Sequence, residues 1–201
     1  MASLPIHRYT PEEYLEIERK AEFKSEYYAG EMFAMAGGSP AHATISINLA
    51  SELRFLFRGR PCQPFNGDVR VQISDGASYA YPDVSVVCGE QQFSDKHKDT
   101  LLNPSVIVEV LSPSTEAYDR GLKFELYCLI EGLQEYVLVS QDKMRIELFE
   151  RQGDGSWRMT AMKKPEDFLH LPSVDARIRL ADIYEKVEFT PRPPQIRERN
   201  P

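Results

Sequence analysis

The sequence lacks the features of a membrane or disulfide-rich protein. No apolar stretch approaches the roughly 20 residues that a helix needs to cross a bilayer. The first eight residues lack the apolar core of a signal peptide. The cysteines Cys62, Cys88 and Cys128 are odd in number, and none forms a CxxC pair. We therefore expect a cytoplasmic protein with incidental reduced thiols and no zinc site.

Positive charge is also scarce. Lysine and arginine number 24 against 31 acidic residues, which gives a net charge of −7. This balance argues against a broad phosphate-binding surface, but it allows a local basic groove or an enzyme whose metal ions bridge acids to phosphate. The length of 201 residues suits one sizeable domain. We expect that domain over residues 1–190 and a disordered, proline-rich tail over 191–201.

One carboxylate, Glu109, stands inside the otherwise aliphatic run Val106–Leu111. Such a run predicts a central strand that is buried on both faces. A buried ionised carboxylate is costly unless a metal ion, a lysine or both compensate it. A second acid, Asp83, stands where another predicted strand begins. Two acids on neighbouring core strands suggest a built site, although Asp83 alone also fits a turn and Glu109 a buried ion pair.

Lys123 is the third candidate for this site. It lies on a predicted helix that follows the Glu109 strand and packs its Leu122 face on the sheet. From there a lysine can reach a metal-bound water or a scissile phosphate. A solvated pair with Asp119, four residues earlier, explains the residue equally well. For the two acids we favour a metal ion, because hard divalent cations take carboxylate oxygens and keep waters.

The order of elements predicts an α/β (α+β) fold, with a mixed sheet flanked by helices and hairpins added at both ends. Apolar spacing and capping residues predict helices over 10–20 and 41–58, a long helix that begins after Thr115 and ends at Gly132, and a short one over 181–187. A hairpin over 22–36 should turn at Ala29-Gly30. Further strands are expected over 62–65, 68–73, 82–88, 105–111, 135–139, 144–150 and 157–163, and the charged stretch 89–103 is expected to be a loop.

Several ordered motifs then resemble a known family. They are Tyr81-Pro82-Asp83, the segments 108–115 and 119–127, and the shorter segments 27–31, 37–42 and 68–71. Together they resemble the Uma-two family of endonucleases, which belongs to the PD-(D/E)XK restriction-endonuclease-like superfamily. The likeness extends from about Tyr9 through Val139. It implies a restriction-endonuclease-like fold and a nuclease site.

The resemblance implies a role for each candidate. Asp83 would be the first metal-binding acid and Glu109 the second, with Mg²⁺ or Mn²⁺ as the cofactor and the carbonyl of Val110 completing the coordination. The superfamily lysine normally stands two residues after the glutamate, where this chain has Leu111. Lys123 matches the relocation of that lysine to the adjacent helix, which some members of the superfamily show.

Other residues are weaker candidates for accessory roles. His42 fits a phosphate contact or a proton transfer as well as it fits a helix cap. Asp68 could support the site residues from outside the site, but we favour the interpretation that it is a turn residue. An early acid also joins the site in many superfamily members, and Glu26, Glu31 and Glu52 are the alternatives. Arg70 and Arg120 are plausible phosphate contacts, although a surface charge explains each of them better.

The favoured function is therefore a metal-dependent endonuclease that hydrolyses phosphodiester bonds in DNA. A homodimer is expected because cutting both strands takes two sites, and the exposed hairpin over 144–163 offers an interface. The alternative is a catalytically silent nucleic-acid-binding or assembly module, which the acidic composition and Leu111 favour. A third reading is hydrolysis of a smaller phosphodiester or nucleotide.

Overall fold

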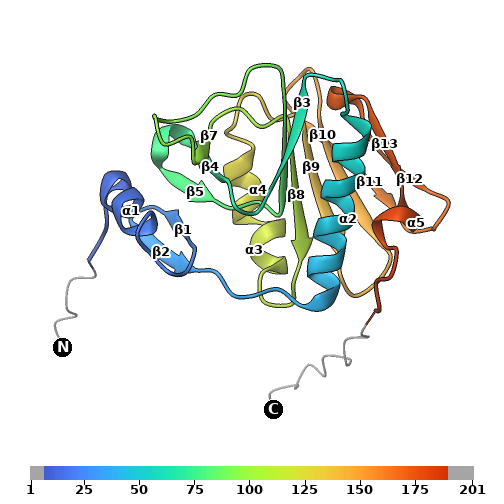
Figure 1. Ribbon diagram of the computed structural model, residues 1–201, viewed down its shortest axis with the longest axis horizontal. Coiled ribbons are helices and arrows are strands. Elements are labelled where there is room, and N and C mark those ends of the chain that lie inside the picture. The colour runs from blue at the N-terminus through green and yellow to red at the C-terminus, as the bar shows by residue number, and fades with distance from the viewer. Residues whose placement is uncertain (1–6, 190–201) are drawn as a thin grey trace, which may run out of the picture.

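A mixed β-sheet forms the centre of the computed structural model, which describes residues 7–189 (Figure 1). Within these residues the sheet has six strands in the order β11-β10-β9-β8-β6-β3. The strands are β3 (Cys62–Asn66), β6 (Val84–Cys88), β8 (Val106–Leu111), β9 (Glu135–Ser140), β10 (Ile146–Arg151) and β11 (Trp157–Met162). Strands β8 and β9 are parallel and the other neighbours are antiparallel. This confirms the expected mixed sheet; the predicted tail over 191–201 lies outside the described residues.

A second sheet contains the hairpin predicted near the N-terminus. In the described part of the chain its order is β2-β1-β5-β4-β7. The strands are β1 (Ser25–Tyr28), β2 (Glu31–Ala34), β4 (Arg70–Ile73), β5 (Ser78–Ala80) and β7 (Thr100–Leu101). The hairpin turns at Ala29 and Gly30, whose φ angles of 49° and 90° suit a tight turn. Strand β7 lies in the stretch that was expected to be a loop, so that expectation was wrong there.

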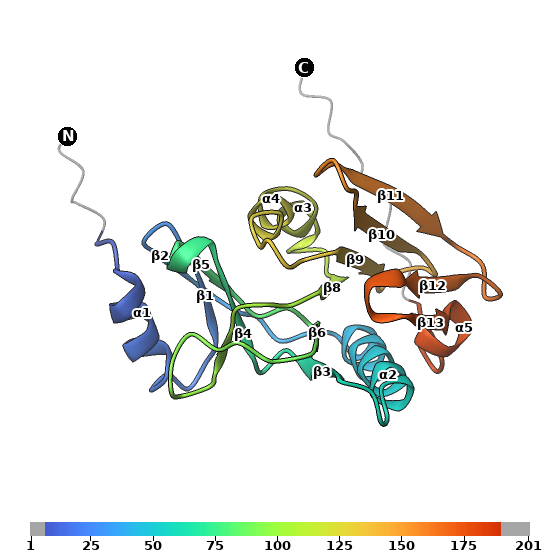
Figure 2. The same ribbon diagram turned by 90° about the horizontal axis from the view of Figure 1, so that it is seen from above.

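Helices cover both faces of the central sheet, as Figure 2 shows. Helix α2 (Pro40–Leu56) packs on one face, and α3 (Glu116–Arg120) and α4 (Leu122–Tyr127) pack on the other. The expectation of one long helix after Thr115 was wrong, because the chain breaks at Gly121 with φ −112° and ψ −106°. A Cβ atom there would lie 3.1 Å from the Ala117 carbonyl oxygen. The break separates the residues around Asp119 from those around Lys123.

Strand β8 is buried along its whole length, as its sequence predicts. Val106, Val108 and Val110 pack with α2 on one face, while Ile107 and Leu111 pack with α4 on the other. Because side chains alternate along a strand, Glu109 points to the same face as Ile107 and Leu111. The carboxylate is therefore directed into the layer between the sheet and α3–α4.

The ends of the described chain pack against these layers. Helix α1 (Pro11–Glu18) is capped by Thr10, which forms a capping box with Glu13. Strands β12 (Phe168–Leu171) and β13 (Ala176–Arg179) form a hairpin that joins the α2 side of the core. Helix α5 (Leu180–Ile183) is shorter than expected, and single 3-10 turns occupy Ser74–Gly76 and Pro172–Val174. No helix of the described residues is long and apolar enough to cross a membrane.

Cys62 and Cys88 form a disulfide, which corrects the expectation of incidental reduced thiols. The antiparallel register of β3 and β6 places the two residues directly opposite each other. Their separation of 26 residues gave no sign of this pairing, because it depends on the strand register. Cys128 remains a free, partly buried thiol.

Candidate active site

Asp83 and Glu109 come together where the two sheets join. Asp83 lies in the short connection between β5 and β6, one residue before Val84. Val84 pairs with Val108 across the antiparallel β6–β8 ladder, so the next position along this register brings Asp83 beside Glu109. The Asp83 Oδ2 atom accepts a hydrogen bond of 2.7 Å from the Val110 N–H. The β8 backbone thus fixes one acid against the other.

Lys123 reaches both of the nearest carboxylates from α4. Its Nζ atom lies 2.8 Å from Glu109 Oε1 and 2.9 Å from Glu26 Oε1. Asp119 Oδ1 is farther away, at 3.7 Å. Lys123 therefore lies both in the site with Glu109 and beside Asp119, the two positions that the sequence offered for it, and the contact with Glu109 is the closer one. All four side chains are buried, so none of these interactions is a solvated surface pair.

Glu26 and Tyr127 complete the surroundings of the lysine. Glu26 comes from β1, and its Oε1 also accepts a hydrogen bond from the Tyr81 N–H at 3.2 Å. The Tyr127 hydroxyl donates to Glu109 Oε1 at 2.8 Å. Sequence reasoning missed Tyr127, although its place four residues after Lys123 was a usable signal, because residues at that spacing share a helix face. It named Glu26 without being able to choose among the early acids.

Negative charge exceeds positive charge in this cluster. Burial raises the pKa of Glu109 well above its usual value; Lys123 opposes the shift, while Asp119, Asp83 and Glu26 add to it. Burial also raises the pKa of Asp119. For Lys123, burial alone lowers the pKa, but the neighbouring carboxylates raise it well above the usual value. Three carboxylates, those of Glu109, Glu26 and Asp119, thus surround one ammonium, and Asp83 adds a fourth acid beside Glu109. A further cation would stabilise this arrangement.

His42 faces Asp83 from the first turn of α2. The Ser39 hydroxyl caps this helix by accepting from the His42 N–H at 3.1 Å. The imidazole Nε2 lies 3.2 Å from Asp83 Oδ2. Burial alone lowers the pKa of His42, but the hydrogen bond and the charge of Asp83 outweigh burial and raise it. Gly38 permits this placement, since a Cβ atom there would lie 2.9 Å from the ring Nδ1.

Five of the weaker candidates lie outside the lining of the cavity that the acids share: Asp68, Arg70, Arg120, Glu31 and Glu52. Asp68 is exposed in the turn between β3 and β4 and pairs with Lys24, which agrees with the turn interpretation. Arg70 is buried, with 2 % of its surface exposed, so the expectation of a surface charge was wrong. The remaining candidates make other contacts: Arg120 pairs with Glu116 and Glu147, Glu31 pairs with Arg8, and Glu52 is partly buried on α2.

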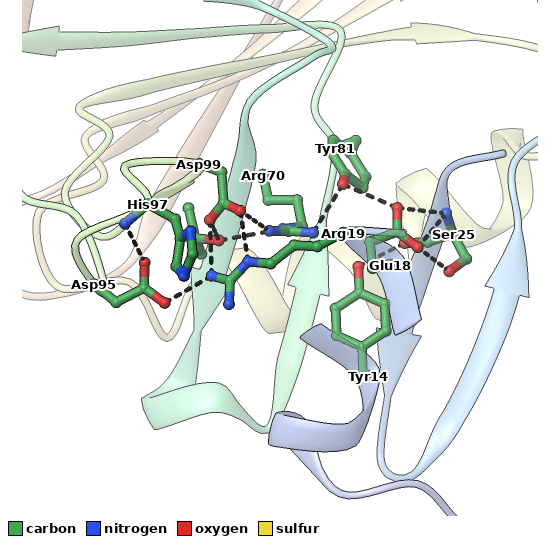
Figure 3. Close-up of polar contacts among 10 residues, drawn as sticks. Tyr14, Glu18, Arg19, Ser25, Arg70, Tyr81, Asp95, His97 and Asp99 are labelled. Atoms are coloured by element: carbon green, nitrogen blue, oxygen red, sulfur yellow. Dashed lines mark hydrogen bonds and ion pairs between the residues drawn. The ribbon is translucent and has the colours of Figure 1, made fainter. Parts of the chain in front are cut away.

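Arg70 belongs to a buried polar network that holds the segment before Asp83 (Figure 3). It donates to the Tyr81 hydroxyl at 3.2 Å and pairs with Asp99 at 2.7 Å. The Tyr81 hydroxyl in turn donates to Glu18 of α1 at 3.0 Å. Tyr81 is two residues from Asp83, and its N–H binds the Glu26 carboxylate. By holding Tyr81, this network therefore helps to position both Asp83 and Glu26.

A cavity of about 680 Å³ is lined by Asp83, Glu109, Lys123, His42 and Glu26 together. Within the described part of the chain, no three His, Cys, Asp or Glu side chains gather so as to hold a metal ion by themselves. Two carboxylates nevertheless fit Mg²⁺, which commonly takes one or two protein acids and keeps several waters. The contacts of Asp83 fall on Oδ2 and those of Glu109 on Oε1. Among the described residues no hydrogen bond falls on the second oxygen of either carboxylate, so that oxygen is available to a cation.

Comparisons with known proteins support a nuclease-like assignment. The model of the Uma2 family, described as "Putative restriction endonuclease", matches residues 11–181. The uncharacterized protein slr1290 of Synechocystis sp. is 38% identical over 187 residues, which are 93% of this chain and 97% of that protein. The uncharacterized protein sll1609 of the same organism is 39% identical over 153 residues, 76% and 86% of the two chains. A crystal structure titled a putative nuclease belonging to DUF820, from Anabaena variabilis, shares the fold with a TM-score of 0.72 at 22% identity, covering 90% of this chain and 98% of that one.

Proposed function

This chain belongs to the Uma2 family, and from its site geometry we propose that it is a metal-dependent endonuclease that hydrolyses phosphodiester bonds in DNA. One observation carries the proposal. Asp83, directly before β6, and Glu109, on the neighbouring strand β8, share a cavity with the buried ammonium of Lys123. Two acids and an amine in this arrangement are suited to phosphodiester hydrolysis with a divalent cation.

Asp83, Glu109 and the carbonyl of Val110 would hold Mg²⁺ or Mn²⁺. When bound, the ion would lower the pKa of a water molecule and neutralise charge on the phosphate. The Val110 N–H holds Asp83 in place, and the Tyr127 hydroxyl holds Glu109. Because these donors are fixed by β8 and α4, the ligand oxygens are preorganised before substrate arrives.

Lys123 and His42 supply the groups that handle charge and protons. The raised pKa of Lys123 keeps its ammonium charged, so it can orient the attacking water or stabilise charge that develops on the phosphate. The raised pKa of His42 favours a protonated imidazole beside Asp83. In that state the ring can donate a proton to a leaving oxygen.

The proposal is tested by incubating plasmid DNA with the protein and Mg²⁺ or Mn²⁺. Asp83→Asn and Glu109→Gln should each lower the cleavage rate by at least about a hundredfold, because each removes a charge that holds the ion. Asp68→Asn is the matched control, since Asp68 is exposed outside the cavity. Equal cleavage by the wild type and both site variants would refute the assigned site.

A silent binding or assembly module is the second candidate. The observation that favours it is that Lys123 is already paired with Glu109 and Glu26, so the cluster is partly neutralised without a metal ion. Calorimetry separates the two candidates. Heat of Mg²⁺ or Mn²⁺ binding that disappears in Glu109→Gln supports the nuclease, whereas no binding at millimolar metal supports the silent module.

A further inference from the structure

The mouth of the acid-lined cavity is apolar. Phe33 and Met35, from β2 and the loop after it, line the cavity together with Leu122 of α4. They are 49%, 39% and 37% exposed, respectively. Large apolar side chains that stay exposed around a concave site mark a surface that receives a ligand. Here that surface is continuous with Asp83 and Glu109.

Two tyrosines in the same lining have hydroxyls that bond to no other residue of the described chain. Tyr28 of β1 and Tyr118 of α3 are both partly buried and both line the cavity. Within residues 7–189 neither hydroxyl makes a hydrogen bond, whereas those of Tyr127 and Tyr136 bond to Glu109 and to the Asp119 carbonyl. Neither hydroxyl is among the fully buried polar atoms without a partner, so both are open to the cavity. These two are therefore available to a ligand that has both a flat apolar face and polar edges.

The cavity offers little to a chain of phosphates. Among the described residues that line it, Lys123 and His42 are those able to carry positive charge. Lys123 is held by Glu109 and Glu26, and His42 faces Asp83. A protein that follows a duplex backbone needs several cations along the groove. Recognition here must therefore rest on another part of the nucleotide.

We propose that this cavity takes an unpaired nucleobase next to the scissile phosphate, so that the substrate is a nucleic acid whose base is not stacked in a duplex. The inference rests on the proposed function and names its substrate class. Every base presents a π-face for aromatic and apolar side chains and polar edges for hydroxyls. The volume of about 680 Å³ lies within the usual range for small-molecule sites.

The unpaired base can come from a single strand or from a nucleotide extruded from a duplex. Binding is measured by fluorescence anisotropy with Ca²⁺ in place of Mg²⁺, using oligonucleotides of equal length. The probes are a single strand, a fully paired duplex, a duplex with one bulged nucleotide, and a single strand of abasic deoxyribose phosphates. We expect the single strand to bind about tenfold more tightly than the paired duplex and the abasic strand. Tight binding of the bulged duplex identifies an extruded base as the source, and weak binding identifies the single strand.

Variants show whether the mouth of the cavity is the binding surface. Met35→Ser and Tyr118→Ser should each weaken binding of the single strand by about fivefold or more, since each removes a contact with the base. Met159→Ser is the matched control: it removes a methionine that is 51% exposed on β11, outside the cavity lining. Binding like the wild type is expected for this control.

The inference would be overturned by equal binding of the paired duplex and the single strand, or by equal binding of the abasic strand. It would also be overturned if Met35→Ser and Tyr118→Ser had no effect beyond that of Met159→Ser. Absence of binding to every probe would overturn it as well. A different result would contradict the proposed nuclease function, so the two proposals can be told apart. Metal-dependent cleavage that ignores base pairing would leave the nuclease standing, and base-dependent binding without cleavage would leave the binding site standing.

Discussion

Lys123 is the residue whose removal should most disturb the candidate site. Its ammonium compensates Glu109 and Glu26, and all three side chains are buried. Lys123→Met keeps most of the side-chain volume but leaves both acids without their cation. We expect the free energy of unfolding, measured in urea, to fall by about 3–5 kcal/mol, the usual cost of breaking a buried ion pair from one side.

The matched control for this prediction is Lys24→Met. Lys24 pairs with Asp68 at the surface, where both side chains are well exposed. Exposed pairs contribute at most about 1 kcal/mol. The double variant Lys123→Met/Glu109→Gln should recover part of the lost stability, because it removes one of the stranded charges. A loss for Lys123→Met no larger than that for Lys24→Met would contradict the burial argument.

Asp83 and Glu109 predict a response of stability to metal ions. A ligand that binds the folded state alone stabilises it by about 2.7 kcal/mol at a concentration 100 times its dissociation constant. Mg²⁺ should therefore raise the melting temperature of the wild-type protein, and a chelator should reverse the rise. Asp83→Asn should lose the response, whereas Asp68→Asn should keep it. A rise of equal size in Asp83→Asn would place the ion elsewhere.

At the scale of elements, Tyr81 ties α1 and β4 to the segment that carries Asp83. Its hydroxyl donates to Glu18 and accepts from Arg70, both of which are buried. Tyr81→Phe keeps the ring and leaves these charged groups without that partner. We expect the free energy of unfolding to fall by about 1–3 kcal/mol. Tyr28→Phe is the control, since the Tyr28 hydroxyl has no partner among the described residues, and an equal loss in both variants would contradict the prediction.

The loop that contains Asp99 should make the stability of this region depend on pH. Burial alone raises the pKa of Asp99, but Arg19, Thr100 and Arg70 outweigh it and hold the pKa below the usual value of 3.8. The folded state therefore binds the proton more weakly than the unfolded state. The stabilisation is fully present above pH 3.8 and is lost as the pH falls through the lowered pKa.

Urea unfolding of the wild type and of Asp99→Asn at several pH values measures this effect. The difference between their free energies of unfolding should be constant from pH 7 to about pH 5 and should shrink below that. Asp75→Asn, at an exposed position in the 3-10 turn Ser74–Gly76, is the control, and its difference from the wild type should be small throughout. A difference between the wild type and Asp99→Asn that grows as the pH falls would have the wrong sign.

Patterns within one element predicted more of the fold than contacts between elements did. The buried strand Val106–Leu111 and the turn at Ala29-Gly30 followed from local composition, and both are confirmed. The break at Gly121 was missed because the apolar spacing on its two sides continues as if the helix were whole. Strand β7 was missed because its two residues are stabilised by pairing with β4, which a polar local sequence does not reveal.

The same limit applies to the candidate site. Asp83, Glu109 and Lys123 could be proposed together because each lies in or next to a strongly patterned element. Glu26 could not be chosen over other acids, since its place beside Lys123 depends on how β1 lies against the Tyr81 backbone. The Cys62–Cys88 bond likewise depends on the register of two strands. Sequence spacing does not carry register between distant segments.

At the scale of the whole molecule, the net charge of −7 sets how nucleic acid can be bound. Each phosphate that a lysine or arginine neutralises makes the slope of log affinity against log salt concentration more negative, by about 0.7 for a single strand. A cavity with Lys123 and His42 as its cations should give a slope of log affinity against log salt no steeper than about −1.4. A protein that makes six to ten phosphate contacts would give about −4 to −7.

Titrations of a labelled single strand at several salt concentrations test this slope. Arg54, Arg58 and Arg60 line a separate cavity near the end of α2. These three cations form the alternative surface that could bind phosphates. Arg54→Gln and Arg58→Gln should leave the slope unchanged if the acid-lined cavity binds the strand by its base. A steep slope that becomes shallower in these variants would show that phosphates follow α2 instead, because only lost cation–phosphate contacts reduce the number of counterions released.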